Sequence, residues 1–225
     1  LSQIAAEMLG IPMEKITFIS SDTQTTPYDE ATGASRTMFF CGRALYEACE
    51  KARDRLFEAA GRLLGVQDVR KYEIKDGVIY LKAFPEKNVT VEQAAFASEQ
   101  LFGRPIVESA SFSGYATTPD PENGHALLYE RHTFGTQIAE IDVDELTGEI
   151  DVRKLVAVHS CGTVINPMLV EGQIYGGVQM GLGQALMEEM KEREDGTVIS
   201  DTFSEYHIPT AADMPRIFVV DTVQC

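Results

Sequence analysis

Apolar side chains recur at helical spacing in four stretches of the chain. The pattern predicts a helix over residues 1–9, which Gly10 ends, and a long helix over residues 36–64. Thr90 and Gln93 have the spacing of a capping box, which predicts a third helix reaching about residue 102. Asn166, with Pro167 at the first helical position, predicts a fourth helix that ends near residue 187.

Alternating apolar and polar residues predict the strands. Asp76-Gly77 suits a type I′ turn, so residues 72–81 should form a hairpin in which Ile74 faces Ile79. Further strands are expected at residues 15–20, 134–143, 150–160 and 217–223. Because hairpin and crossover connections both occur, we expect an α+β fold in which mixed sheets are packed by long helices. A stretch rich in proline and glycine, residues 117–124, should separate two subdomains at residues 1–116 and 125–225.

Composition narrows the class of protein. A length of 225 residues with 44% hydrophobic residues suits one or two globular domains. The 19 basic and 35 acidic residues give a net charge of −16, which argues against nucleic acid and anionic membranes as partners. The four cysteines and four histidines lack the spacing of a zinc site. The sequence around the cysteines is mostly apolar, which is typical of free thiols. We therefore expect a cytoplasmic protein whose side chains ligate no metal directly.

The polar loop before the long helix is the first candidate site. In the segment ATGASRT, residues 31–37, Gly33 and Ala34 let an anion approach the backbone. Thr32 and Ser35 offer hydroxyl groups, and Arg36 offers a guanidinium group. A phosphate or pyrophosphate site fits this pattern. A simple helix cap, in which Ser35 bonds the first turn and Arg36 stays in solvent, fits it as well.

The second candidate site is the helix that begins after Asn166, because it contains many glycines. Each glycine costs about 1 kcal/mol relative to alanine, so close approach of another backbone or of a flat ligand should offset the loss. Gln173 and Gln179 could then read the edge of a heterocycle, since an amide both donates and accepts hydrogen bonds. Tight packing against another helix explains the glycines equally well. The glycines are Gly172, Gly176, Gly177, Gly181 and Gly183.

Three carboxylates lie in a loop that contains prolines, near the end of the chain. Asp201, Glu205 and Asp213 are candidates for a catalytic carboxylate. The alternative is a solvated surface, which the acidic composition of the whole chain favours.

Two blocks of the sequence resemble the molybdopterin-binding subunit of molybdenum hydroxylases, the family of xanthine dehydrogenase and aldehyde oxidase. The first block covers residues 1–48 and includes QIAAEMLGIP, SSDTQTTPYDEATGASRT and CGRALYEA. The second covers residues 136–210 and includes QIAEIDVDELTGEIDV, HSCGTVINPMLVEGQIYGGVQMGLGQALMEE and YHIPTAADMP. The blocks keep the order of the family, whereas residues 66–124 match it less clearly.

The resemblance implies a cofactor and the residues that bind it. In this family molybdenum is held by the dithiolene of a pterin, which in bacterial members is often linked to cytidine. Residues Thr32 to Arg36 fall on the family's cofactor loop, with Ala34 at a backbone contact. Gln173 falls on a glutamine that contacts the pterin. The resemblance thus favours the ligand-binding interpretation of both candidate sites, and we expect the two segments to bind one pterin-type molecule.

The resemblance also implies a reaction and partners. Such enzymes hydroxylate N-heterocycles, purines among them, or aldehydes with oxygen from water, while a glutamate acts as base. Electrons leave through iron–sulfur centres, usually to flavin, on other domains or subunits. A minority branch oxidises carbon monoxide.

The family's GQG turn and its catalytic glutamate would lie before Leu1 and beyond Cys225. We therefore expect that this chain contains no catalytic residue and is a fragment truncated at both ends. The chain alone should not turn over substrate. The rest of the molybdenum subunit is then a required partner. Two other hypotheses remain: a cofactor-binding subunit of a split enzyme, and a stand-alone protein that has lost the chemistry.

Overall fold

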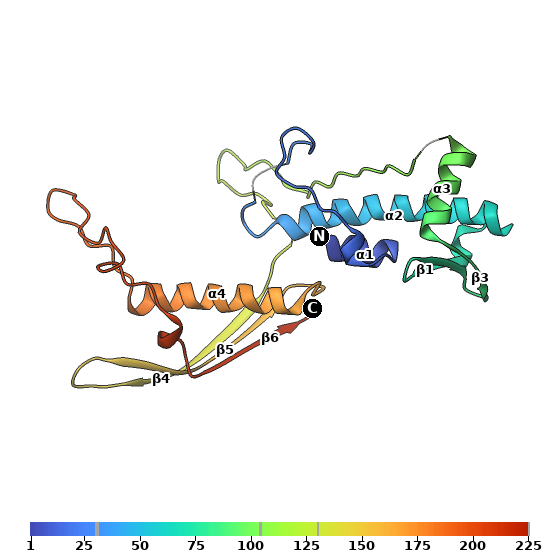
Figure 1. Cartoon of the computed structure of the whole chain (residues 1–225). Helices are drawn as coiled ribbons and strands as arrows, with labels where there is room; N and C mark the ends of the chain where they lie inside the picture. The colour runs from blue at the N-terminus through green and yellow to red at the C-terminus, as the bar shows by residue number, and fades with distance from the viewer. Residues whose placement is uncertain (30–31, 104, 130, 225) are drawn as a thin grey trace. The chain divides into compact units, whose positions relative to one another are not determined.

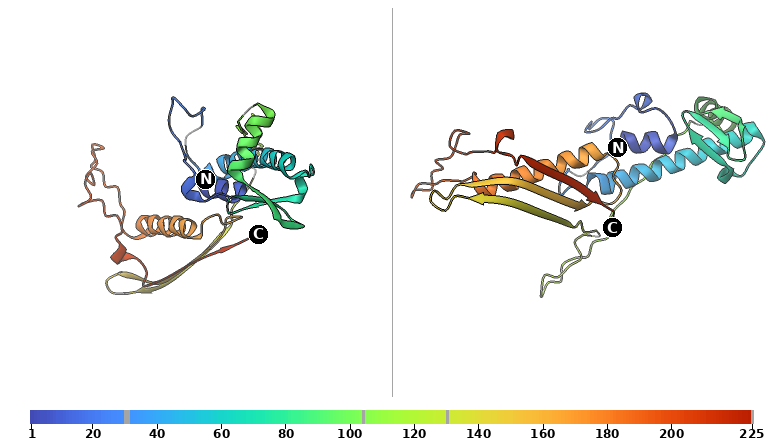
Figure 2. Two further views of the ribbon diagram at one scale, coloured as in Figure 1. Left: turned by 45° about the vertical axis from the view of Figure 1, so that its right-hand side comes forward. Right: turned by 90° about the horizontal axis from the view of Figure 1, so that it is seen from below.

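Contacts between residues divide the chain into two units, Leu1–Glu130 and Arg131–Cys225. The computed structural model describes residues 1–29, 32–103, 105–129 and 131–224. Each unit combines helices with a three-stranded sheet (Figures 1 and 2). The expected α+β fold with mixed strand directions is confirmed.

Three helices and a small antiparallel sheet make up the first unit. The two shorter helices lie against α2, and Gly10, Gly65 and Gly103 end α1, α2 and α3 with left-handed backbones. These helices begin and end within about one residue of the positions that the sequence predicts. The elements are α1 (Ser2–Leu9), α2 (Thr37–Leu64), β1 (Tyr72–Lys75), β2 (Val78–Leu81), β3 (Phe84–Thr90) and α3 (Val91–Phe102), with short 3-10 helices at Met13–Lys15 and Val69–Lys71.

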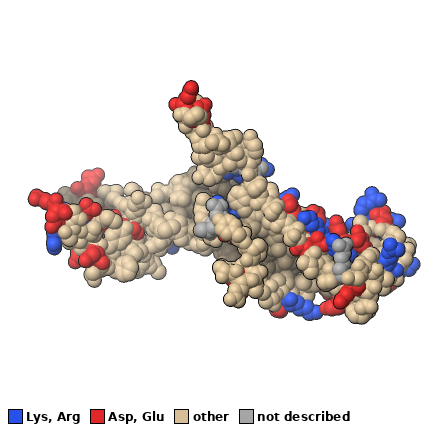
Figure 3. Space-filling view, turned by 90° about the horizontal axis from the view of Figure 1, so that it is seen from above, with Lys and Arg blue, Asp and Glu red and all other residues tan. Residues whose placement is uncertain are grey.

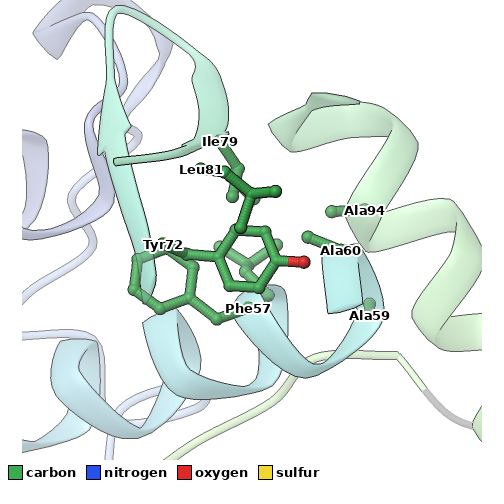
Figure 4. Close-up of a cluster of buried hydrophobic side chains, with 8 residues drawn as sticks. Phe57, Ala59, Ala60, Tyr72, Ile79, Leu81 and Ala94 are labelled. Atoms are coloured by element: carbon green, nitrogen blue, oxygen red, sulfur yellow. The ribbon is translucent and has the colours of Figure 1, made fainter. Parts of the chain in front are cut away.

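The core of the first unit lies where the second half of α2 meets the sheet and α3. Figure 4 shows the aromatic rings of Phe57 and Tyr72 beside Ile79, with the small Ala60 and Ala94 between the two helices. Ala60, Ala94 and Ile79 are fully buried. The alanines allow α2 and α3 to approach closely, because they place only a methyl group between the helices. This core anchors the second half of the helix that follows the candidate loop.

The hairpin has the expected register. Ile74 pairs with Ile79 and Tyr72 with Leu81, and the turn residues Asp76 and Gly77 both have positive φ, as a type I′ turn requires. The sequence did not predict β3, which pairs antiparallel with β2 across a bulge at Tyr80/Leu81.

The strand expected at residues 15–20 is wrong. A 3-10 helix ends at Lys15, and residues 16–20 have no regular structure. Phe18 and Ile19 are 53% and 59% exposed. Alternation alone does not make a strand, since a strand needs a neighbour with which to pair.

Charges of both signs mix on the surface of the first unit. Arg43 pairs with Glu47 one turn further along α2 at 2.8 Å, and Lys15 pairs with Glu92 at 3.1 Å. Figure 3 shows Lys/Arg and Asp/Glu side chains interspersed over the end that holds α3 and the first sheet. Such exposed pairs contribute little stability, so the core carries most of it.

The second unit consists of a mixed sheet covered by one helix. Strand β5 lies in the middle, antiparallel to β4 and parallel to β6. Helix α4 forms the crossover between the parallel strands, as a parallel connection requires. The three strands and α4 match their predicted positions to within about two residues, whereas the short 3-10 helix was not predicted. The elements are β4 (Gly135–Val143), β5 (Ile150–Ser160), α4 (Pro167–Leu186) and β6 (Ile217–Val223), with a short 3-10 helix at Ala211–Asp213.

Helix α4 packs one face on the sheet. Val178 is buried against Leu155 and Ala157 of β5, and the rings of Tyr175 and Phe218 meet edge to face at 4.7 Å. Asn166 caps the helix by accepting a hydrogen bond from the Leu169 N–H group. In the part of the chain that the structure describes, no helix has the length and apolarity needed to span a bilayer.

Candidate functional site

The loop before α2 has an unusual backbone. Ala34 and Ser35 have φ values of 50° and 54°, so two consecutive residues with side chains occupy the left-handed region. Each such residue costs about 1–3 kcal/mol, and the cost persists only where the surrounding structure enforces the conformation. Strained backbone of this kind clusters at ligand-binding sites, where it presents N–H groups to an anion. Ala31 of the same motif lies outside the described residues.

The simple helix cap is not what the structure contains. The N-cap residue of α2 is Arg36, not Ser35, and it makes no side-chain capping hydrogen bond. Thr32 to Ser35 are all exposed. The amino terminus of a helix carries a partial positive charge, so this end of α2 suits a negatively charged group.

Two contacts tie the loop to α2. The Cys41 thiol donates a hydrogen bond to the Asp29 carboxylate at 3.4 Å, and the Thr37 hydroxyl lies 3.5 Å from that of Thr32. Burial, reinforced by the hydrogen bond to Asp29, raises the pKa of the Cys41 thiol. Cys41 is therefore a protonated donor near neutral pH, and it holds the early part of the loop against the helix.

An aromatic cluster surrounds the first turn of α2. The rings of Phe39 and Phe40 meet edge to face at 5.0 Å, and Phe112 packs against both at 5.6 and 6.0 Å. The Arg36 guanidinium lies 5.9 Å from the centre of the Phe40 ring. Neither Phe112 nor Asp29 was a sequence candidate. Their partners lie 12 or more residues away in the chain, so no local pattern could indicate them.

The second candidate residue, Gln173, lies on α4 in the other unit and is exposed. Gly172, Gly176 and Met180 recur one turn apart beside it, on the face opposite Val178. Met180 is 64% exposed, and no atom of the same unit lies within 4 Å of the Cβ positions at Gly172 and Gly176. The helix packing that could explain these glycines does not occur within the described residues of this unit. The open glycine face therefore leaves room for a flat group.

Gln179 and Gly183 have a different role from Gln173. The Gln179 amide donates to the carbonyl oxygen of Pro209 at 3.1 Å, and a Cβ at Gly183 would collide with Glu188 and Pro209. The Tyr206 hydroxyl donates to Glu188 at 2.7 Å. These contacts hold the segment after α4 against the end of the helix. Gln179 is thus a structural residue in this unit.

The three candidate carboxylates are exposed. Asp213 accepts hydrogen bonds from the hydroxyl and N–H groups of Thr210, which lower the pKa of its carboxyl group. Asp213 therefore closes a capping box of the 3-10 helix. Asp201 and Glu205 lie at the surface, as the solvated interpretation expects. Among the described residues, no group of three or more His, Cys, Asp or Glu side chains is arranged to hold a metal ion.

Each segment, taken by itself, has features that suit one part of a pterin cofactor that carries a phosphate. The left-handed turn and the amino terminus of α2 suit the anion, and the hydroxyls of Thr32 and Ser35 are exposed beside them. On α4, the open glycine face next to Gln173 suits a flat ring with donors and acceptors on its edge.

Comparison with known proteins covers nearly the whole chain. Residues 1–215 match the family model of the molybdopterin cofactor-binding domain. The chain is 30% identical to the carbon monoxide dehydrogenase large chain of Hydrogenophaga pseudoflava over 96% of its own length and 26% of that protein. It is 28% identical to the xanthine dehydrogenase molybdenum-binding subunit of Escherichia coli O157:H7, over 96% of its length and 28% of that protein.

The fold agrees with these relatives. A crystal structure of the Cu,Mo-CO dehydrogenase in its carbon monoxide reduced state superposes with a TM-score of 0.81 and 29% identity, over 100% of this chain and 27% of that one. The chain thus spans about a quarter of the length of the relatives that it matches. Because the family model matches from Leu1 almost to the end, the chain belongs to the molybdopterin cofactor-binding domain family of molybdenum-dependent oxidoreductases.

Proposed function

We propose that this chain forms part of the cofactor-binding subunit of an enzyme that hydroxylates N-heterocycles or aldehydes with oxygen from water. The observation that carries the proposal is the backbone of Ala34 and Ser35, which both lie in the left-handed region. This turn comes directly before α2, whose N-cap residue, Arg36, makes no capping hydrogen bond with its side chain. A backbone of this kind is costly, and it clusters at ligand-binding sites. The match to the molybdopterin cofactor-binding domain family supports a molybdopterin cofactor as the ligand, since its phosphate is an anion and its pterin ring is flat.

The cofactor-binding residues are those of the two candidate segments. We assign Thr32, Gly33, Ala34, Ser35 and Arg36 to the phosphate-bearing part of the cofactor, with Ala34 contributing backbone contacts. Gln173 contributes an amide that can donate to and accept from the pterin ring. When bound, the molybdenum cofactor supplies the redox chemistry, and the chain positions it. The proposal includes the cytosine dinucleotide form of the cofactor, which the family resemblance implies for many bacterial members.

Iron–sulfur and flavin centres on other domains or subunits complete the proposed enzyme and accept its electrons. The rest of the molybdenum subunit supplies the catalytic glutamate. We place the enzyme in the cytoplasm, because Cys41, Cys49 and Cys161 are free thiols and such thiols persist in reducing compartments.

A second candidate substrate is carbon monoxide. Both the carbon monoxide dehydrogenase large chain and the Cu,Mo-CO dehydrogenase structure resemble this chain over almost its whole length. The residues of this chain that face the cofactor in the proposal, Ala34 and Gln173 among them, serve the pterin rather than the substrate. They are therefore compatible with either substrate class.

The test uses the full-length protein, isolated with its partners. We expect about one molybdenum and one pterin per subunit, and reduction of an acceptor dye by one class among N-heterocycles, aldehydes and carbon monoxide. The 225-residue chain alone should contain little molybdenum and oxidise none of them. A full-length protein that binds no pterin would refute the proposal. Bound pterin without turnover would favour a cofactor-binding subunit of a split enzyme.

A further inference from the structure

An extended segment follows α3 and lies along α2. Residues 105–112 have no regular structure and run beside the long helix (Figure 1). Ile106 packs against the hydrophobic core. Glu108, whose side chain is only 13% exposed, forms an ion pair with Arg55 of α2. We call residues 105–112 the strap.

The strap continues toward the first turn of α2. Lys51 donates a hydrogen bond to the Ser109 carbonyl oxygen at 3.0 Å. Phe112 then packs against Phe39 and Phe40 at 5.6 and 6.0 Å. The strap thus links the core to the helix turn that directly follows the candidate loop.

The candidate loop needs support from outside itself. Ala34 and Ser35 are left-handed, and Arg36 makes no side-chain capping bond. A strained turn persists only where neighbouring structure holds it. The rings that Phe112 contacts follow the loop directly, and one of them, Phe40, lies under the Arg36 guanidinium at 5.9 Å. Aromatic packing at this point is therefore suited to fix the loop.

We propose that Phe112 is a positioning residue for the cofactor-binding loop at Thr32 to Arg36. The strap anchors Phe112 to the core through Ile106 and to α2 through the Glu108–Arg55 ion pair. Phe112 fixes the first turn of α2 and with it the left-handed turn. The loop is then preformed before the cofactor arrives, so little ordering is required on binding. The role in cofactor binding rests on the proposed function, but the effect on the loop does not.

The test measures hydrogen exchange of the full-length protein after its cofactor is removed. Phe112→Ala should speed exchange in the peptide covering residues 32–40 by about tenfold, because an aromatic cluster of this kind is lost. Exchange around Phe57 in the core should stay unchanged. Phe112→Tyr retains the ring and should restore slow exchange. Phe96→Ala removes a ring that is 64% exposed on α3 and is the matched control.

The same variants are then loaded with cofactor. Phe112→Ala should retain about tenfold less molybdenum and pterin than the wild type at equal melting temperature, and Phe112→Tyr should retain normal amounts. Unchanged exchange at residues 32–40 in Phe112→Ala would overturn the inference, as would a mobile loop with full cofactor retention. If cofactor binding does not slow hydrogen exchange of residues 32–40 in the wild type, the proposed cofactor site is wrong. The effect of Phe112 on exchange in the cofactor-free protein is measured independently of that result.

Discussion

The side-chain amide of Gln179 donates a hydrogen bond to the carbonyl oxygen of Pro209, 3.1 Å away. This bond joins α4 to a segment 30 residues further along the chain. Gln173, on the same helix, is exposed. The glycine-rich pattern alone suggests that both glutamines could hydrogen-bond to the edge of a heterocycle. In the structure the two residues have different surroundings.

The two glutamines should respond differently to truncation. Gln179→Ala should lower the free energy of unfolding by about 1–2 kcal/mol, because a partly buried carbonyl group loses its donor. Gln173→Ala should leave the stability of the cofactor-free protein within about 0.5 kcal/mol of the wild type. In the protein purified with its cofactor, the same substitution should lower the molybdenum content. Urea denaturation and elemental analysis of both variants check this. Equal molybdenum content in Gln173→Ala and wild type would remove Gln173 from the proposed site.

Substitutions at two glycines of α4 should also have different effects on stability. A Cβ at Gly183 would lie 2.7 Å from Pro209 Cδ and would also collide with Glu188, whereas a Cβ at Gly181 meets nothing within 4 Å. Gly183→Ala should destabilise the protein by about 1–3 kcal/mol through overpacking. Gly181→Ala, the matched control, should stabilise the cofactor-free protein by about 0.5–1 kcal/mol, since alanine favours helix. Thermal unfolding of the two variants measures the difference, and equal shifts would contradict the packing described at Gly183.

The capping box at the start of α3 should contribute measurable stability. Thr90 accepts a hydrogen bond from the Gln93 N–H group at 3.1 Å, and the Gln93 side chain accepts one from the Thr90 N–H group at 2.9 Å. Thr90→Ala should therefore cost about 1 kcal/mol in urea denaturation. Thr90→Ser keeps the hydroxyl and should lose less than half of that. A full loss in both variants would mean that the methyl group, not the cap, stabilises the helix.

Thiol labelling should follow burial. Burial raises the pKa of Cys41, with a further contribution from Asp29, and burial also raises the pKa of Cys49, whereas Cys161 is exposed. Only the thiolate reacts, so at pH 8 iodoacetamide should label Cys161 well before the other two. Because both raised values favour the protonated thiol, labelling of Cys41 should accelerate only as the pH rises above the usual range of a free thiol.

Asp29→Asn provides the internal check on that order. Removing the neighbouring negative charge should lower the pKa of Cys41 and speed its labelling, with no effect on Cys161. Peptide mass spectrometry resolves the sites. An unchanged rate at Cys41 would show that the contact with Asp29 has no influence on the thiol.

The sequence alone determined the features that depend on neighbours in the chain. The register of Ile74 opposite Ile79 follows from the Asp76-Gly77 turn, and the start of α3 follows from Thr90 and Gln93. Apolar residues at helical spacing after Arg36 predict the helix that follows the loop at Thr32 to Arg36, and the role of that loop in binding stays a prediction. In each case the deciding hydrogen bonds or steric limits lie within a few residues, so a local pattern is enough.

Strand pairing and side-chain contacts between residues far apart in the sequence became visible only in the tertiary structure. Residues 16–20 alternate like a strand but pair with no strand among the described residues, whereas β3 pairs with β2. Pro209 rather than a ligand engages Gln179, and Phe112 reaches Phe40 across 72 positions of the sequence. Such contacts depend on how the chain packs, and packing joins residues whose separation in sequence carries no periodic signal.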